Sequence, residues 1–194
     1  MDERQLIRSA RNGNIQDFNH LVVRFQDQVY RQAFYMLPDA SLAELVAQDT
    51  FVQAFNHLHS YRGPSFRLWL LRLAIQRCLN RPGLHIERKP AAPLHHAGQF
   101  EKALTAPPSA RRKTQLSAQS AGLHHLLHQQ LQGLPPLDRA AIVLTEVQCL
   151  SCAEAAEVLQ ISENRFKAYL VQARKQLCLN LTQATRSCPA TGLA

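Results

Sequence analysis

Polar and basic side chains near the C-terminus are the residues whose types and spacing point most clearly to a function. Arg165, Lys167 and Arg174, with Asn164 beside them, lie off an apolar stripe that has helical spacing. Arginine can bind guanine through two hydrogen bonds, asparagine can bind adenine in the same way, and lysine can pair with phosphate. These residue types on one helix favour DNA recognition, although the solvated face of an ordinary helical bundle shows the same pattern.

Thiol and imidazole side chains form a second group, with a potential for metal binding or redox chemistry. Cys149 and Cys152 make one C-x-x-C pair without a second pair, whereas a structural zinc site normally needs four ligands. His124 and His128 are one helical turn apart, but no carboxylate or cysteine accompanies them at ligand spacing. We predict no metal site and interpret the two cysteines as small apolar residues, with redox or metal sensing as the alternative.

The sequence lacks the motifs of common catalytic sites. It contains no nucleophile elbow, P-loop or H-E-x-x-H motif. Its 7 glycines also argue against a glycine-rich nucleotide-binding sheet. The residues offer no candidate catalytic site, and we expect no bound cofactor.

The elements that must position the C-terminal basic residues read as a helix-turn-helix. Ser151 and Glu154 have the spacing of a capping box, in which each side chain binds the other residue's backbone N–H at a helix start. The turn Gln160–Ser162 separates this short helix from a second helix, and together they match the helix-turn-helix pattern. We expect the inward residues to be Ala155, Ala156 and Leu159, followed by Phe166, Leu170, Ala173, Leu177 and Leu181.

Amphipathic helices also account for the first third of the chain. A stripe at the 3.6-residue period, from Phe18 through Val29 to Leu37, predicts a helix that stops at Pro38. A second helix is expected from Leu42 to about Leu58 with Ser41 as its N-cap, and a third is expected after Ser65 until Pro82-Gly83. The inward residues predicted for these two helices are Leu42, Leu45, Val46, Ala54, Phe55 and Leu58, then Phe66, Trp69, Leu70, Leu73 and Ala74.

A proline-interrupted segment without helical periodicity separates the two groups of helices. The chain of 194 residues carries a net charge of +8, and about half of this excess falls in residues 82–118. Such a segment buries too little apolar surface to offset the entropy lost on ordering, so we predict a flexible linker. The expected organisation is all-α, with helical domains at 1–81 and 119–182, the linker at 82–118 and a tail at 183–194.

The chain is expected to act in the cytoplasm, without membrane insertion. No apolar run approaches the roughly 20 residues that span a bilayer, and the first residues lack a signal-peptide pattern. The odd number of cysteines, 5, has no disulfide-framework spacing and suits reduced thiols.

Two sets of motifs resemble those of extracytoplasmic-function sigma factors, and they occur along the chain in the order that the family shows. The N-terminal set contains Ala43-Glu44, Ala47-Gln48-Asp49-Thr50-Phe51, Tyr61-Arg62-Gly63, Phe66-Arg67, Trp69-Leu70 and Arg72-Leu73-Ala74. The C-terminal set contains Leu134-Pro135, Arg139, Leu150-Ser151, Glu154, Ala156-Glu157, Leu159, Ile161-Ser162, Lys167, Leu170 and Ala173-Arg174-Lys175. The resemblance implies a transcription initiation factor that binds core RNA polymerase and promoter DNA, with an anti-sigma factor as a natural further partner.

The resemblance also implies roles for individual residues. The polymerase would bind Glu44, Gln48, Asp49 and Gln53 on the second helix. The −10 promoter element, with an unstacked base, would meet Asn56, His57, Ser60, Tyr61, Arg62, Gly63, Arg72, Gln76 and Arg77. The −35 element would meet Arg139, Glu163, Asn164, Arg165, Lys167, Ala168, Val171 and Arg174.

Several residues depart from the family pattern. Leu45 replaces a common acid, Asn80 replaces an aspartate, Pro82-Gly83 cuts off an arginine-rich extension, and Gln160 fills a usual glycine position. Arg165, Ala168 and Tyr169 replace the commoner threonine, serine and arginine of the last helix. An altered promoter sequence and a poorly active paralogue both fit these departures.

Two other functions fit the residues. A dimeric helix-turn-helix regulator would bind operators without polymerase. A helical interaction protein would not depend on Arg165 or Lys167 for any DNA affinity.

Overall fold

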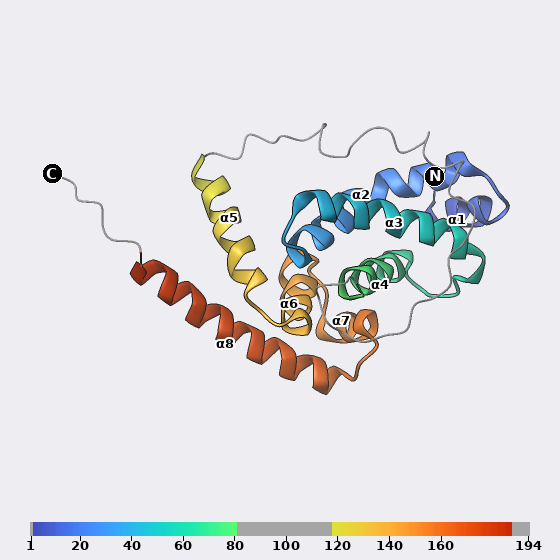
Figure 1. Ribbon diagram of the computed structural model, residues 1–194. Helices are drawn as coiled ribbons and strands as arrows, with labels where there is room; N and C mark the ends of the chain where they lie inside the picture. The colour runs from blue at the N-terminus through green and yellow to red at the C-terminus, as the bar shows by residue number, and fades with distance from the viewer. Residues whose placement is uncertain (1, 81–117, 188–194) are drawn as a thin grey trace. The chain divides into compact units, whose positions relative to one another are not determined.

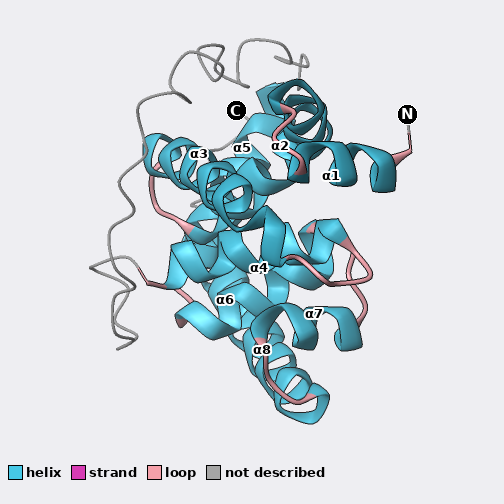
Figure 2. Cartoon of the chain, turned by 90° about the vertical axis from the view of Figure 1, so that its right-hand side faces the viewer, coloured by secondary structure: helices cyan, strands magenta, loops and turns pink. Residues whose placement is uncertain are grey.

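The computed structural model describes residues 2–80 and 118–187. The chain divides into two compact units, residues 1–116 and 117–194, and every regular element in the described ranges is a helix (Figures 1 and 2). The all-α expectation is thereby confirmed. The predicted linker lies outside the described residues except for Ala118, which begins a helix.

Within residues 2–80, four α-helices and one short 3₁₀ turn build the N-terminal unit. Helix α2 is the central element, because α1, α3 and α4 all pack against it. Figure 1 shows these elements in blue to green, and their bounds are α1 (Glu3–Arg11), α2 (Ile15–Met36), α3 (Ala40–His57), η1 (Leu58–Ser60) and α4 (Phe66–Leu79).

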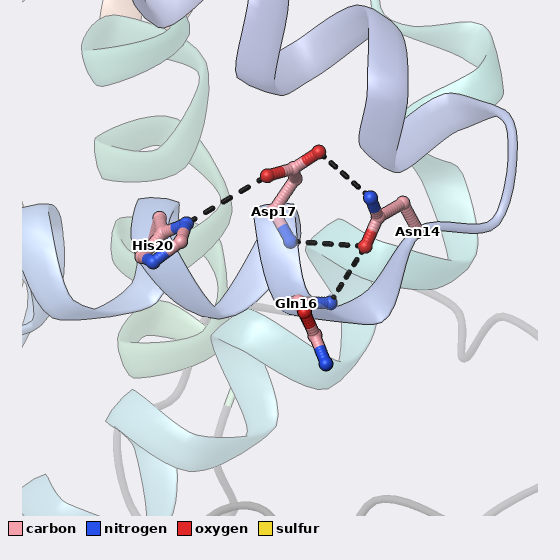
Figure 3. A network of polar contacts seen from close by, with 4 residues as sticks. All are labelled: Asn14, Gln16, Asp17 and His20. Carbon is pink, nitrogen blue, oxygen red and sulfur yellow. Dashed lines mark hydrogen bonds and ion pairs between the residues drawn. The ribbon is translucent and has the colours of Figure 1, made fainter. Parts of the chain in front are cut away.

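A polar cap turns the chain from α1 into α2. The Asn14 side-chain oxygen accepts hydrogen bonds from the backbone N–H groups of Gln16 and Asp17, at 3.0 and 3.3 Å (Figure 3). Its amide nitrogen donates to the Asp17 carboxylate at 2.8 Å, and a second Asp17 oxygen lies 3.7 Å from the His20 ring. Gly13 precedes the cap with a φ of 93°, a conformation that glycine adopts without steric cost. The cap satisfies N–H groups that a helix start leaves unpaired and fixes the turn between the two helices.

Helix α3 buries Val46, Ala54 and its C-cap Leu58 as predicted, but its N-cap and one leucine differ from the prediction. Its N-cap is Asp39, whose carboxylate accepts the Ser41 backbone N–H at 3.2 Å, so the prediction of Ser41 as the cap was wrong. Leu45, predicted inward, is 50% exposed, while the smaller Ala43 and Ala47 are buried. Small residues let two helices approach closely, so these alanines suit the contact of α3 with α2 and α4.

Helix α4 follows the prediction more closely. The Ser65 hydroxyl accepts the Leu68 backbone N–H at 3.3 Å, which confirms the predicted cap. Phe66, Leu70 and Ala74 are buried as expected, and Trp69 is half-buried against the same core. The helix ends at Leu79, before the predicted Pro82-Gly83 stop.

The C-terminal unit is built around a long last helix that contacts three others. Helix α8 packs against α5, α6 and α7, and its Phe166 and Ala173 are fully buried. The element bounds are α5 (Ala118–Gln132), α6 (Pro136–Ile142), the π-helical turn η4 (Val143–Val147), α7 (Cys152–Leu159) and α8 (Glu163–Ser187).

Candidate nucleic-acid and polymerase interfaces

The predicted helix-turn-helix forms from α7, a tight turn and α8. The capping box at Ser151 is present: its hydroxyl oxygen accepts the Glu154 N–H at 3.3 Å, and its own N–H donates to the Glu154 carboxylate at 2.9 Å. Gln160 ends α7 in the left-handed conformation, with a φ of 57°. The next N–H, of Ile161, returns to the Ala156 carbonyl at 3.1 Å, so the turn closes on itself.

The predicted −35 residues of α8 lie on its exposed side. Phe166 and Leu170 on the opposite side are buried, which orients the helix. Because residues three and four apart share a helix face, the outward residues form one continuous surface. They are Glu163, Asn164, Arg165, Lys167, Ala168, Val171 and Arg174.

Two cations on this surface already have acidic partners. Lys167 Nζ lies 2.6 Å from a Glu163 carboxylate oxygen, and this hydrogen bond raises the pKa of Lys167. Arg174 donates to Glu146 of η4, also at 2.6 Å. Both pairs are solvent-exposed, so phosphate can displace the carboxylates at little cost. Arg165 lies over the Tyr169 ring, with its guanidinium carbon 5.8 Å from the ring centroid.

Arg139 does not belong to this surface. It is only 5% exposed, and its guanidinium donates to the Gln132 side-chain oxygen at 2.5 Å, to the Gln132 carbonyl at 2.8 Å and to the Leu134 carbonyl at 3.1 Å. Helix ends leave carbonyls without partners, and Arg139 satisfies those at the end of α5. Arg139 was predicted to contact a phosphate of DNA. In the structure it is instead an interior residue that caps the end of α5. Its neighbour Asp138 is also buried, and burial raises the pKa of that carboxyl.

The predicted −10 loop rests on an aromatic cluster. Tyr61 is 7% exposed, and its ring centroid lies 5.5 Å from that of Phe66 and 5.2 Å from that of Trp69. Burial raises the pKa of the Tyr61 phenol, Glu3 reinforces the rise, and Arg11 and Arg4 oppose it. Tyr61 therefore supports the loop from inside and does not offer an exposed face on which a base could stack.

Hydrogen bonds to backbone carbonyls hold the same loop from outside. Arg62 donates to the His59 carbonyl at 2.7 Å and to the Tyr61 carbonyl at 3.1 Å, and Ser60 donates to the His57 carbonyl at 2.7 Å. A Cβ added at Gly63 would lie 3.2 Å from the Tyr61 ring, so the glycine allows the close approach of loop and ring. Ser60, Arg62 and Gly63 remain exposed, while Asn56 and His57 are half-buried.

The predicted polymerase-binding residues form one polar surface on α3. Gln48 and Asp49 are exposed, whereas Glu44 and Gln53 are half-buried. Arg77 of α4, which we predicted to face DNA, donates to Gln53 at 2.9 Å and to Asp49 at 3.3 Å. Arg77 therefore lies beside the predicted polymerase-binding residues of α3. The other two α4 residues of the DNA set, Arg72 and Gln76, are half-buried.

Sequence reasoning missed the contribution of α1. Leu6, Ile7 and Ala10 join the hydrophobic core, and Arg11 reaches across to the −10 loop. The Arg11 guanidinium donates to the Leu58 carbonyl at 3.1 Å and to the Tyr61 carbonyl, and its carbon lies 5.7 Å from the Tyr61 ring centroid. The available signal was the spacing of arginines at 4, 8 and 11, which places them on one helix face.

Side chains that could bind a metal lie dispersed over residues 2–80 and 118–187. No three His, Cys, Asp or Glu side chains in these ranges gather into a possible metal site. Cys149 and Cys152 are free thiols, with Cys149 in the left-handed conformation at a φ of 54°. No helix of the described parts is long and apolar enough to cross a membrane.

A bipartite helical protein with a C-terminal helix-turn-helix is the class that this fold and these surfaces define. Two family models match it: sigma-70 region 2 over residues 21–82 and sigma-70 region 4 over residues 124–177, together more than half of the chain. The chain therefore belongs to the sigma-70 family of RNA polymerase sigma factors, and its named relatives place it with the extracytoplasmic-function type.

Named relatives span almost the whole chain. RNA polymerase sigma-H factor of Pseudomonas aeruginosa is 28% identical over 183 residues, which cover 90% of this chain and 91% of the relative. The extracytoplasmic-function sigma factor SigM of Bacillus subtilis is 28% identical over 153 residues, 79% of this chain and 88% of the relative. The solved structure of CnrH in complex with the cytosolic domain of CnrY is similar to this chain, with a TM-score of 0.66 and 24% sequence identity. The match covers 93% of this chain and 97% of the solved chain, and it supports the fold.

Proposed function

We propose that this protein is an alternative sigma factor in which each unit reads one promoter element while the N-terminal unit also binds core RNA polymerase. The observation that carries the proposal is the pairing of two family-matched units, each with an exposed polar or basic surface at the predicted place. The protein would act in the cytoplasm, where polymerase and chromosome meet, and it would not be an enzyme.

The C-terminal unit would dock α8 in the major groove of the −35 element. Arg165, Lys167 and Arg174 are exposed on a helix that a buried opposite side holds in place. The side chains near a recognition helix N-terminus reach base edges and phosphates in helix-turn-helix proteins. Glu163 and Glu146 would release their cations to DNA on binding.

The N-terminal unit would combine the other two contacts. The loop after η1 would hold the opened −10 strand through its exposed residues Ser60, Arg62 and Gly63. The α3 surface, with Gln48 and Asp49 at its centre, would bind polymerase. We keep the predicted division of the chain at residues 81 and 119, with the intervening segment as a linker.

Two weak DNA contacts on one chain gain strength when polymerase fixes their separation. Each contact raises the effective concentration of the other, without any new interaction. A partner that held the two units in another arrangement would switch the factor off, so an anti-sigma factor is the expected regulator.

In-vitro transcription tests the proposal directly. Purified core polymerase with the full chain should select promoters from a random library that core polymerase alone does not select. Selection by a matched active sigma factor but not by this chain would refute the proposal. Specific binding of the chain to duplex DNA without polymerase would instead favour the dimeric regulator.

Substitution of one cation on α8 then tests the assigned surface. Lys167→Ala should weaken binding of the holoenzyme to −35 duplex and reduce the dependence of affinity on salt, because one phosphate contact is lost. Arg31→Ala is the control, since Arg31 is an exposed cation of α2 that belongs to neither predicted DNA-binding set nor to the polymerase-binding set. If the two substitutions have equal effects on affinity and on its salt dependence, Lys167 does not contact the −35 duplex.

A further inference from the structure

Two thiols flank the residues that open α7, and the proposed function uses neither of them. Cys149 is exposed, Cys152 is half-buried, and both are free. Only Leu150 and Ser151 separate them, so the two thiols are near neighbours along the chain. Redox-sensing cysteines are accessible and often lie beside a second cysteine that resolves the first oxidation product.

The backbone between the two thiols is held in a defined turn. Leu150 is 5% exposed, and its N–H donates to the Leu144 carbonyl at 3.1 Å, which closes the end of η4. Ser151 follows as the extended N-cap of α7, with a φ of −64° and a ψ of 160°, and its capping box with Glu154 fixes that conformation. Cys149 completes the turn in the left-handed conformation, at a steric cost that glycine would avoid.

Cys152 also lies within electrostatic reach of the predicted −35 surface. The hydrogen bond and the charge of Glu163 raise the pKa of Lys167, and a negative charge on the Cys152 sulfur adds a smaller contribution in the same direction. Lys167 belongs to the predicted −35 set on α8. A change in the state or position of Cys152 therefore alters the electrostatics of that surface.

We propose that Cys149 and Cys152 form a redox-active thiol pair, which hydrogen peroxide converts to a disulfide, and that only the reduced form binds the −35 element. One deprotonated thiol attacks a peroxide oxygen, the O–O bond breaks, and the departing hydroxide takes up a proton and leaves as water. The second thiol attacks the resulting sulfenic sulfur, an S–S bond forms, and the S–O bond breaks as the hydroxyl leaves with the proton of that thiol as a second water. Peroxide gains the two electrons that the two sulfurs lose. A dithiol reverses the reaction by two thiol–disulfide exchanges and is itself oxidised to a disulfide.

The disulfide requires a different turn at the start of α7. A disulfide holds its two Cα atoms about 4.4 to 6.8 Å apart, whereas an extended residue lengthens the path between them. Closing the bond therefore draws Ser151 out of its extended conformation and opens the capping box with Glu154. Because α7 packs against α8, loss of its first turn disturbs the support of the −35 surface. The effect on DNA rests on the proposed function, whereas the thiol chemistry does not.

Peroxide treatment of the full chain tests the inference with two readouts. The chain is oxidised with hydrogen peroxide, desalted, and examined by peptide mass spectrometry for a link between Cys149 and Cys152. It is then assembled with core polymerase, and its affinity for −35 duplex from a selected promoter is measured before and after reduction with dithiothreitol. The variants are C149S/C152S, which lacks the pair, and C178S, a control at an exposed thiol of α8.

The wild type and C178S should both form the link and lose −35 affinity at least about fivefold, and dithiothreitol should restore it. Fivefold corresponds to about 1 kcal/mol, which is the usual cost of removing a serine N-cap. C149S/C152S should keep its affinity after peroxide. The wild-type readouts decide the inference by themselves if circular dichroism shows that this variant does not fold.

Several results would overturn the inference. The treated wild type would lack the link, would carry a link to another cysteine or a second chain instead, or would carry the link and keep its −35 affinity. An equal loss of affinity in C149S/C152S would place the oxidised group elsewhere. If the reduced wild type fails to assemble or to bind −35 duplex, the proposed function is refuted. Hydrogen exchange of the α7 amides then decides the inference, and unchanged exchange in the linked chain overturns it.

Discussion

The two regions assigned to DNA hold their contact residues in different ways. On α8, the exposed residues need only the register of one helix, which Phe166 and Leu170 fix by burial on the other side. The −10 loop is held by several separate contacts. The Tyr61 ring packs on Phe66, Arg62 donates to the His59 carbonyl, and Arg11 of α1 donates to the Leu58 carbonyl. A helix surface is thus specified locally, whereas the loop depends on the packing of the entire N-terminal unit.

This difference predicts how the regions respond to substitution. A change on α8 should alter one contact and leave the rest of the surface in place. A change in the aromatic cluster should alter all loop residues together. In the C-terminal unit, residues that stabilise the fold without facing DNA provide the corresponding test. Their substitution should change the stability of the unit and leave its DNA affinity unchanged.

The largest effect is expected from Tyr61→Ala. Loss of a buried aromatic ring costs about 3 kcal/mol of unfolding free energy, and the −10 loop should lose its shape while α8 does not. Urea unfolding followed by the fluorescence of Trp69, the chain's single tryptophan, measures the first effect. Binding to −10 single strand and to −35 duplex measures the second. Tyr61→Phe keeps the ring and should behave like the wild type; equal loss in both variants would contradict support by ring packing.

Arg139→Gln should destabilise the C-terminal unit by about 2 kcal/mol, because buried carbonyls lose their hydrogen-bond partners. Hydrogen exchange of the α5 and α6 amides measures the change. The salt dependence of DNA affinity should stay at the wild-type value, since the side chain is interior. Arg165→Gln is the comparison, with a reduced salt slope and unchanged exchange. A reduced slope in Arg139→Gln would restore the phosphate contact predicted from the resemblance.

Gln160→Gly should stabilise the C-terminal unit by about 1 kcal/mol, since a non-glycine residue in the left-handed conformation carries a steric cost of that order. Thermal unfolding followed by circular dichroism gives the sign. DNA affinity should not change, because the glycine preserves the turn. A destabilised variant would mean that the contacts of the glutamine side chain outweigh the backbone strain.

The smallest effect is expected from Glu146→Gln. Its exposed pair with Arg174 contributes about 0.5 kcal/mol or less to stability. Removing the acid frees Arg174 and should raise the affinity for −35 duplex about twofold, in line with the small free energy of an exposed ion pair; fluorescence anisotropy measures the change. Glu157→Gln removes an exposed acid of α7 that belongs to no pair with Arg174 and is the control. An equal rise in both variants would indicate a general charge effect.

Several features that depend on a few neighbouring residues were predicted from the sequence, although the cap of α3 is Asp39 and not Ser41. The Ser151 capping box and the Ser65 cap each involve a side chain and a backbone group within one turn, so the sequence contains both partners. The order of the helices and the buried side of α8 follow from apolar periodicity in the same way.

Features that depend on distant partners were not predicted. The contacts of α3 with α2 and α4 leave Leu45 exposed, although its apolar type predicted an inward position. Arg139 reads as a basic surface residue until the end of α5 is placed beside it. Helix α1 carries no motif of the resemblance, and its link to the loop joins residues about fifty positions apart. The assignments of individual DNA- and polymerase-binding residues stay predictions.

The fastening of α1 also limits where the chain can be cut. The region 2 family match begins at residue 21, yet Leu6, Ile7 and Ala10 cover part of the core that Phe18 and Leu21 complete. A fragment cloned from residue 21 would leave that apolar surface open to solvent, and exposed patches of this kind promote aggregation. Such a fragment would also lack the arginine that fastens the loop. Soluble N-terminal fragments should therefore retain α1, and tags at that end should be joined through a spacer.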